Sequence, residues 1–188
     1  MLIEDLSENL YEDLNGQVIS TDQSNRGLLV TLECDDWENQ SQRRRRRFLL
    51  LCTDVKESTL TVGAVGWVKF VSEHPVLLEH NSDHSELMFS SAPENPFEVI
   101  GRLMEAHTEI YGHWRTLAEH LNVSHSILSG GYGLVARGPH LVMQKYAAAI
   151  DNLLKVNIVH SYKPKTQFKC LIFEDQFLVC SAVEVMEI

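Results

Sequence analysis

The sequence predicts an α+β protein in which one long and one medium helix pack on one face of a large, mostly antiparallel sheet. We expect about eight or nine strands in this sheet and a short helix at the N-terminus. This fold class follows from two observations. Residues 95–122 form a capped amphipathic segment, and residues 17–90 and 156–188 contain strand-like apolar runs. The early connections are too short for helical crossovers, which favours antiparallel pairing. We therefore expect a single domain over residues 1–188.

The first ninety residues predict a short helix followed by strands. Over residues 1–15, apolar side chains recur at helical spacing and Gly16 provides a stop signal. Residues 17–90 then read as a series of antiparallel strands. Strict alternation of apolar and polar residues is clearest over residues 28–34, and the run 48–53 is apolar on both faces, which is typical of a central strand.

The segment 95–122 predicts the helix around which the chain is organised. Asn95 can cap it, Pro96 occupies the first helical position, and Glu98 completes an Asn-x-x-Glu capping pattern. At about 100° per residue, one face carries a stripe of mostly apolar side chains that we expect to lie on the preceding strands. The members of this stripe are Phe97, Ile100, Leu103, Met104, His107, Tyr111, Trp114, Ala118 and Leu121.

The second half of the chain predicts another helix and the last strands. We expect the second helix to begin at Gly138-Pro139 and to run to about Lys155, so that both large helices fall within residues 95–155. Strands follow over residues 156–188. A three-residue turn at 174–176 would place Cys170 opposite Cys180. The run 177–187 is long and apolar, and such a strand at a sheet edge needs a cover or a partner, which makes a homodimer or other homo-oligomer one expectation.

Charge and cysteine usage narrow the class of protein. The 188 residues carry 26 acidic and 16 basic side chains, and five of the basic ones form the run Arg43–Arg47. The remaining surface is therefore strongly acidic, which disfavours a nucleic-acid partner or an anionic membrane. The chain shows no secretory signal pattern, no apolar run near the roughly 18 residues of a membrane span, and no Cys-x-x-Cys pair. We expect a cytoplasmic protein with reduced thiols and no membrane association.

Histidine is frequent, with nine in the chain, and His107 is the most informative because it lies within the apolar stripe. A core histidine bonded to a carbonyl or a tyrosine is one interpretation, and the others are a ligand contact, a catalytic base or a pH-sensitive hinge. His80 and His84 share a short segment with two carboxylates, but their spacing matches no established metal motif. A polar turn accounts for this segment, and we predict no metal and no cofactor.

The glycine-rich segment over residues 130–140 is the best candidate for ligand contact. It formally contains Gly-x-Gly-x-x-Ala, but Gly138-Pro139 interrupts the chain where a dinucleotide-binding helix should already run. Arg137 lies beside the expected start of the second helix, where free amide groups suit a carboxylate or a phosphate. The alternative is a helix-to-helix connection whose glycines only permit close packing.

These patterns favour a non-catalytic binding or protein–protein interaction module. No nucleophile elbow or His-Glu-x-x-His motif is present, so the sequence gives no support for nucleophilic or zinc-dependent catalysis. The arginine run would dock an acidic partner surface through Arg43, Arg44, Arg45, Arg46 and Arg47, unless it is a solvated loop neutralised by nearby carboxylates. The competing hypothesis is a binder of a small anionic ligand, or an enzyme, with a cleft between sheet and helices lined by His107, Tyr132, Arg137 and His140.

Overall fold

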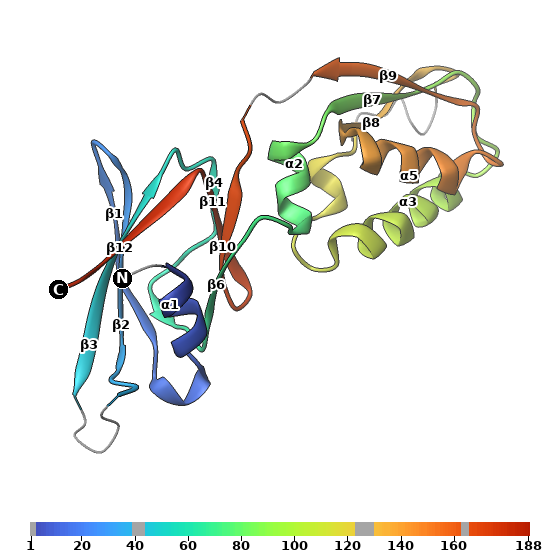
Figure 1. Ribbon diagram of the computed structural model, residues 1–188. Coiled ribbons are helices and arrows are strands. Elements are labelled where there is room, and N and C mark those ends of the chain that lie inside the picture. The colour runs from blue at the N-terminus through green and yellow to red at the C-terminus, as the bar shows by residue number, and fades with distance from the viewer. Residues whose placement is uncertain (1–2, 39–43, 123–129, 163–165) are drawn as a thin grey trace. The chain divides into compact units, whose positions relative to one another are not determined.

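The chain forms an α+β protein with antiparallel strand pairing (Figure 1), which confirms the predicted class. The computed structural model describes residues 3–38, 44–122, 130–162 and 166–188. These residues contain four α-helices and twelve strands, and the strands form sheets of five, four and three rather than the one large sheet that was expected. The chain divides into two compact units, which we call unit 1 (Met1–Leu77 and Gln167–Ile188) and unit 2 (Leu78–Thr166).

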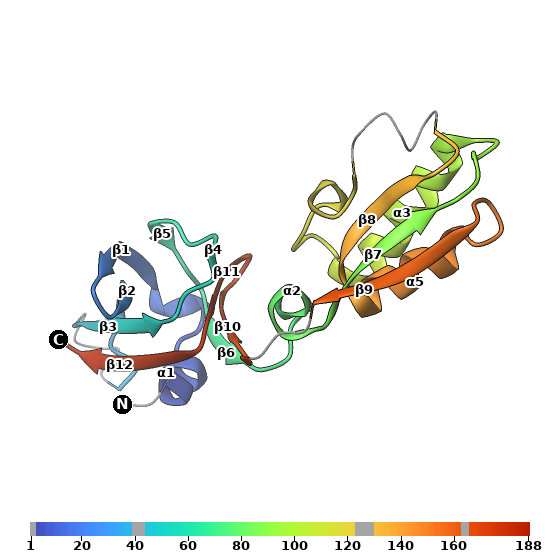
Figure 2. The same cartoon turned by 90° about the horizontal axis from the view of Figure 1, so that it is seen from above.

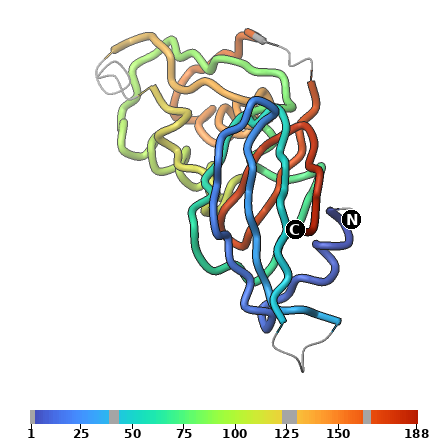
Figure 3. The backbone as a smooth tube through the Cα atoms, turned by 90° about the vertical axis from the view of Figure 1, so that its left-hand side faces the viewer, coloured from blue at the N-terminus to red at the C-terminus, as the bar shows by residue number. Residues whose placement is uncertain are grey.

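Unit 1 contains two sheets. The five-stranded sheet has the order β12-β3-β2-β1-β5, and Figure 3 shows its longer strands side by side. Its strands are β1 (Gln17–Ser24), β2 (Gly27–Asp35), β3 (Arg45–Thr53), β5 (Gly63–Ala64) and β12 (Ala182–Glu187). The four-stranded sheet has the order β4-β11-β10-β6 and consists of β4 (Glu57–Ser58), β6 (Val68–Val71), β10 (Lys169–Phe173) and β11 (Gln176–Cys180). The expected single strand over residues 177–187 is therefore wrong, since Ser181 divides it between the two sheets.

One hydrophobic core serves both sheets of unit 1 and its N-terminal helix. The expected helix over residues 1–15 is shorter than predicted: α1 (Ile3–Asn9) ends early, and the 3₁₀ helix η1 (Glu12–Leu14) follows. The helical spacing still identified the buried side chains, which are Ile3, Leu6, Leu10 and Leu14. They pack with side chains from both sheets, among them Val30, Leu32, Phe48, Leu50, Leu171, Phe173 and Leu178.

The final hairpin of unit 1 has a different register from the expected one. Its turn has only two residues between Phe173 and Gln176, so Cys170 lies opposite Val179 and not opposite Cys180. The predicted pairing of Cys170 with Cys180 is therefore wrong. The side chain of Cys180 instead hydrogen-bonds with that of Cys52, and this bond together with burial raises the pKa of the Cys52 thiol. All four cysteines are buried in unit 1, and none of them forms a disulfide.

Unit 2 is a three-stranded sheet with two helices on one face (Figure 2). The strand order is β8-β7-β9, with β7 (His84–Phe89), β8 (Gly133–Pro139) and β9 (Val156–Tyr162). The helices are α3 (Pro96–Tyr111) and α5 (His140–Ile150), and a second hydrophobic core lies between them and the sheet. Unit 1 and unit 2 thus each have a hydrophobic core of their own. The series of strands expected over residues 17–90 is interrupted, because η3 (Pro75–Leu77) and α2 (Leu78–Asn81) are helical.

The long helix α3 begins as predicted and ends early. The side-chain oxygen of Asn95 accepts hydrogen bonds from two backbone N–H groups of the first turn at 3.2 and 3.4 Å, and Pro96 is the first helical residue. The helix ends at Tyr111, and Gly112 follows with a φ of 57°, in the left-handed region that favours glycine. The expected continuation to residue 122 is wrong. The 3₁₀ helix η4 (Leu117–Glu119) follows instead.

The buried face of α3 also differs from the predicted stripe. Phe97 is 81% exposed and Met104 is 57% exposed. The side chains that α3 buries are Val99, Leu103, Ala106, His107 and Tyr111. The difference arises because α3 packs beside α5 over the sheet of unit 2, and of the strands in the first ninety residues only β7 belongs to this sheet. No described helix is long and apolar enough to span a membrane.

Gly101 provides a direct test of the exposed side of α3. A Cβ at this position would meet no heavy atom within 4 Å, so alanine fits without a clash. Because glycine is about 0.8–1.0 kcal/mol less favourable than alanine inside a helix, we expect Gly101→Ala to stabilise unit 2 by about 0.5–1 kcal/mol in chemical denaturation.

The contrasting variant for this test is Gly27→Ala in β2. Its Cβ would clash with the backbone carbonyl oxygen of Cys52, and its φ of +143° is unfavourable for alanine. We expect Gly27→Ala to destabilise unit 1. A loss of stability in Gly101→Ala would contradict the placement of Gly101 on the solvent face.

Candidate functional site: a polar pocket in unit 2

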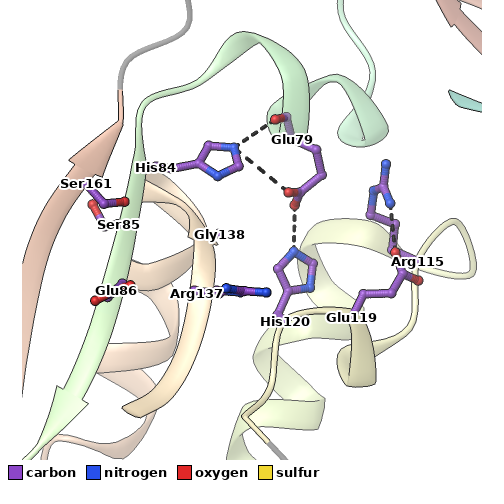
Figure 4. Close-up of a pocket in the computed structure, with 10 residues that line it drawn as sticks. All are labelled: Glu79, His84, Ser85, Glu86, Arg115, Glu119, His120, Arg137, Gly138 and Ser161. Carbon is purple, nitrogen blue, oxygen red and sulfur yellow. Dashed lines mark hydrogen bonds and ion pairs between the residues drawn. The ribbon is translucent and has the colours of Figure 1, made fainter. Parts of the chain in front are cut away.

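A pocket of about 340 Å³ lies in unit 2 and is bordered by α2, the three strands and the segment after α3 (Figure 4). Its lining is almost entirely polar or charged: Glu79, His84, Ser85, Glu86, Arg115, Glu119, His120, Arg137, Gly138 and Ser161. Of the nine histidines in the chain, all except His74 fall within unit 2. The titratable side chains near neutral pH are therefore concentrated in the unit that contains this pocket.

Glu79 of α2 is the central acceptor of the pocket. Its Oε1 atom accepts a hydrogen bond from Nε2 of His120 at 2.6 Å and another from the hydroxyl of Tyr111 at 2.9 Å. Its backbone carbonyl accepts from Nε2 of His84 at 2.8 Å. Burial by itself raises the pKa of Glu79, but the bonds from His120 and Tyr111 and the charge of Arg115 outweigh it, and the pKa is lowered. The carboxylate is therefore ionised near neutral pH.

His120 is the buried partner of Glu79, with only 3% of its surface exposed. Its Nδ1 atom is buried and has no hydrogen-bond partner among the residues that the structure describes. The ionised carboxylate can only accept, so Nε2 of His120 carries the proton of this hydrogen bond. Gly138 makes room for the ring, because a Cβ there would lie 2.6 Å from Cδ2 of His120.

His107 lies behind the pocket, in the core of unit 2. Its Nε2 atom donates to the backbone carbonyl of Arg115 at 2.9 Å, and its Nδ1 atom accepts from the hydroxyl of Tyr146 at 2.6 Å. Burial lowers the pKa of His107, which keeps the ring neutral, and it raises the pKa of Tyr146. Both ring nitrogens of His107 are engaged by the protein, and the residue does not line the pocket.

An internal ion pair forms one wall of the pocket. Arg115 donates from a terminal nitrogen to Glu119 Oε2 at 2.7 Å. The other carboxylate oxygen of Glu119 accepts from the backbone N–H of Thr116 at 2.8 Å, which forms a capping box at the start of η4. Burial alone raises the pKa of Glu119, but the bonds from Thr116 and Arg115 lower it. The charges of Arg115 and Glu119 on this wall are therefore paired with each other.

Two charged side chains of the pocket are open. Arg137 of β8 is exposed, and its guanidinium has no hydrogen-bond or ion-pair partner in the described part of the chain. In Figure 4 this side chain extends toward His120. Glu86 of β7 is the register partner of Arg137, yet its carboxylate likewise has no such partner among the described residues. The pocket therefore offers one cation and one anion to a ligand.

The other predicted ligand contacts lie elsewhere in unit 2. His140 touches the pocket only through Ser85, whose buried hydroxyl lies 2.8 Å from Nδ1 of His140 and 3.5 Å from Nδ1 of His160. The two imidazole rings stack with their centroids 4.2 Å apart. Tyr132 is 80% exposed and is not among the lining residues. The structure thus brings Arg137 to the pocket, His140 next to it, and leaves Tyr132 outside.

The arginine run lies largely in β3, where acidic side chains of neighbouring strands neutralise it. Arg45 and Arg47 pair with Glu33 of β2 at 3.0 and 2.6 Å. Arg46 makes two bonds with Glu187 of β12 at 2.8 and 2.7 Å. Of the two arginines before the strand, Arg44 is exposed and Arg43 lies outside the described residues. Three of the five guanidinium groups are thus used within unit 1.

Sequence and structure comparisons identify no relative of this chain. No protein-family model, no curated protein and no solved structure matches it. Within the described residues, no group of three or more His, Cys, Asp and Glu side chains is arranged to hold a metal ion. The geometry of the pocket is therefore the basis for a functional proposal.

Proposed function

We propose that unit 2 is a non-catalytic binding module that holds a small anionic ligand, a carboxylate or a phosphate, in this pocket. The observation that carries the proposal is the guanidinium of Arg137, which has no partner among the described residues although it stands on the wall of a polar pocket. A guanidinium presents donors in a fixed planar fork that matches the oxygens of a carboxylate or phosphate. Arg137 is the anchor in this proposal.

The other charged groups give the pocket a fixed frame. Arg115 is paired with Glu119, and Glu79 is held by His120 and Tyr111. Side chains that are already bonded lose little further freedom when a ligand arrives, which favours binding. A volume of about 340 Å³ lies near the lower end of the range of small-molecule pockets, about 300–1,000 Å³. The pocket therefore suits a small polar molecule.

The contacts of His107 and His120 support binding rather than catalysis. A catalytic base needs a ring nitrogen within hydrogen-bond reach of the bound molecule. His107 uses both nitrogens inside the protein, and the Nδ1 atom of His120 is buried. The hydroxyl of Ser85 is tied to His140, and the residue has no exposed surface.

A protein–protein interface at the arginine run is the alternative proposal, and it has less support. An interface of this kind needs guanidinium groups that are free to meet an acidic partner. Arg45, Arg46 and Arg47 are instead paired with Glu33 and Glu187 of neighbouring strands. Only Arg44, which is exposed, remains as a described candidate for such a contact.

Removal of the Arg137 guanidinium tests the proposal. We expect Arg137→Gln to weaken the binding of inorganic phosphate and of acetate at least tenfold, because the change removes the charge and the two-pronged donor but keeps a polar side chain. Chemical-shift titration by NMR measures these weak affinities and shows which residues respond. The shifts should centre on β8 and on the turn that contains His120.

The matched control is Arg102→Gln, which removes an exposed arginine of α3 that pairs only weakly with Glu105 at 3.5 Å. This variant should bind the anions as the wild type does. Equal affinities of Arg137→Gln and the wild type would contradict the role of Arg137. Absence of any response of the wild-type pocket to either anion would overturn the proposed function itself.

A further inference from the structure

We infer that the ligand of this pocket is a zwitterion of the α-amino-acid type, with its carboxylate on Arg137 and its ammonium group on Glu86. The inference rests on the proposed function, because it keeps Arg137 as the anion anchor. It adds a second contact that selects among molecules with a carboxylate group. The observations behind it are the placement of Glu86, the charge balance of the lining and the spacing of the two open groups.

Glu86 and Arg137 stand opposite each other on β7 and β8 and both line the pocket. Opposite charges at such a cross-strand position normally attract, but the two side chains form no ion pair with each other. Figure 4 shows the Arg137 side chain directed toward His120 and away from Glu86. An ion pair near the surface contributes little stability even when it forms, so the two groups can each bind one end of a ligand at little cost.

The charge balance of the lining favours a ligand without net charge. Three carboxylates (Glu79, Glu86 and Glu119) face two guanidinium groups (Arg115 and Arg137), which gives a lining of net charge −1 when the histidines are neutral. A simple monoanion would make the occupied pocket more negative, and charge without compensation is unfavourable in a partly enclosed site. A zwitterion leaves the balance unchanged and satisfies both open groups.

The spacing of the two groups also fits. Directly opposite residues on antiparallel strands have their Cβ atoms about 4.5–5.5 Å apart, and both side chains are long enough to reach a common ligand. In an α-amino acid a single carbon atom separates the ammonium nitrogen from the carboxylate carbon. Arg137 can take the carboxylate with two parallel hydrogen bonds, while Glu86 accepts from the ammonium group. The rest of the pocket remains for a small polar side chain.

The experiment compares each of the nineteen standard α-amino acids that have a primary ammonium group with the carboxylic acid that lacks only this group. Thermal-shift screening selects the amino acid that stabilises the wild type most, and calorimetry or NMR titration then gives affinities for the matched pair. We expect the amino acid to bind at least tenfold more tightly than its partner acid. Glu86→Gln should weaken amino-acid binding at least tenfold and strengthen binding of the simple acid. Arg137→Gln should weaken both.

Glu109→Gln is the matched control, because Glu109 is exposed on α3, has no described partner and lies outside the lining. It should leave all affinities unchanged. Equal binding of amino acid and partner acid, together with no effect of Glu86→Gln, overturns the zwitterion while the anion site at Arg137 stands. Failure of both compounds and of phosphate to bind the wild type overturns the proposed function as well.

Discussion

Replacing Glu79 with alanine is expected to lower the free energy of unfolding of unit 2 by about 3–5 kcal/mol. The change removes the oxygen that accepts from the hydroxyl of Tyr111 and from Nε2 of His120. Tyr111 is 1% exposed and His120 is 3% exposed, so both donors are largely shielded from water. Each buried donor left without a partner costs about 1–3 kcal/mol.

Native-state hydrogen exchange of the α3 and α5 amides measures this loss separately from the stability of unit 1. Glu79→Gln keeps an acceptor oxygen and should lose markedly less stability than Glu79→Ala. Glu109→Ala serves as the surface control and should remain within about 0.5 kcal/mol of the wild type. If Glu79→Ala also stays within about 0.5 kcal/mol of the wild type, the carboxylate does not stabilise the core of unit 2.

Acidification from pH 7.5 to pH 5.5 is expected to destabilise unit 2 through His107. Burial lowers the pKa of His107 below its ordinary value of 6.5, so the unfolded chain takes up a proton at a higher pH than the folded one. The contribution of neutral His107 to the stability of unit 2 is therefore complete above the pKa of this residue in the unfolded chain. It is lost as the pH falls through the pKa of His107 in the folded protein. A difference of one bound proton gives a limiting slope of about 1.4 kcal/mol per pH unit.

Denaturation curves at several pH values test this sign. His107→Gln should be less stable than the wild type at pH 7.5 but should depend less on pH between 7.5 and 5.5. His113→Gln, which changes an exposed histidine, should keep the wild-type slope. Below about pH 4.5 a further loss is expected in all three proteins, because the pKa of Glu79 is lowered and its stabilisation disappears when it is protonated. If His107→Gln has the same dependence of stability on pH as the wild type, His107 is not the group that causes it.

The start of α3 could be predicted because a capping asparagine, a proline and a glutamate act locally. Its end could not be read from apolar spacing, since the same period fits residues before and after Gly112. A second capping box, formed by Thr116 and Glu119, marks the break and was the available signal. The predicted buried face was wrong because Phe97 and Val99 lie on different sides of the helix. Tertiary packing decides which side is buried, and it buries Val99 and leaves Phe97 exposed.

The pocket was only partly predictable, for a similar reason. Arg137 was identified from the glycine-rich segment around it, although that segment forms β8 rather than a connection between helices. Its register partner Glu86 lies 51 residues earlier in the chain and carries no motif. Glu79 and His120 are likewise brought together by the fold. Pairings between distant residues depend on strand register and on helix ends, which single-sequence patterns do not determine.

The pairing of β6 with β10 has a consequence for how this chain can change over time. Val71 and Cys170 are hydrogen-bonded neighbours in one sheet, and the whole of unit 2 is encoded between them. Leu77 follows Val71 by six residues, and Gln167 precedes Cys170 by three. Excision of residues 78–166 and closure by a short linker would therefore leave every strand of unit 1 with its neighbours. Such an arrangement is typical of a guest domain spliced into a surface loop of a host, so that each can be gained, lost or exchanged without rebuilding the other.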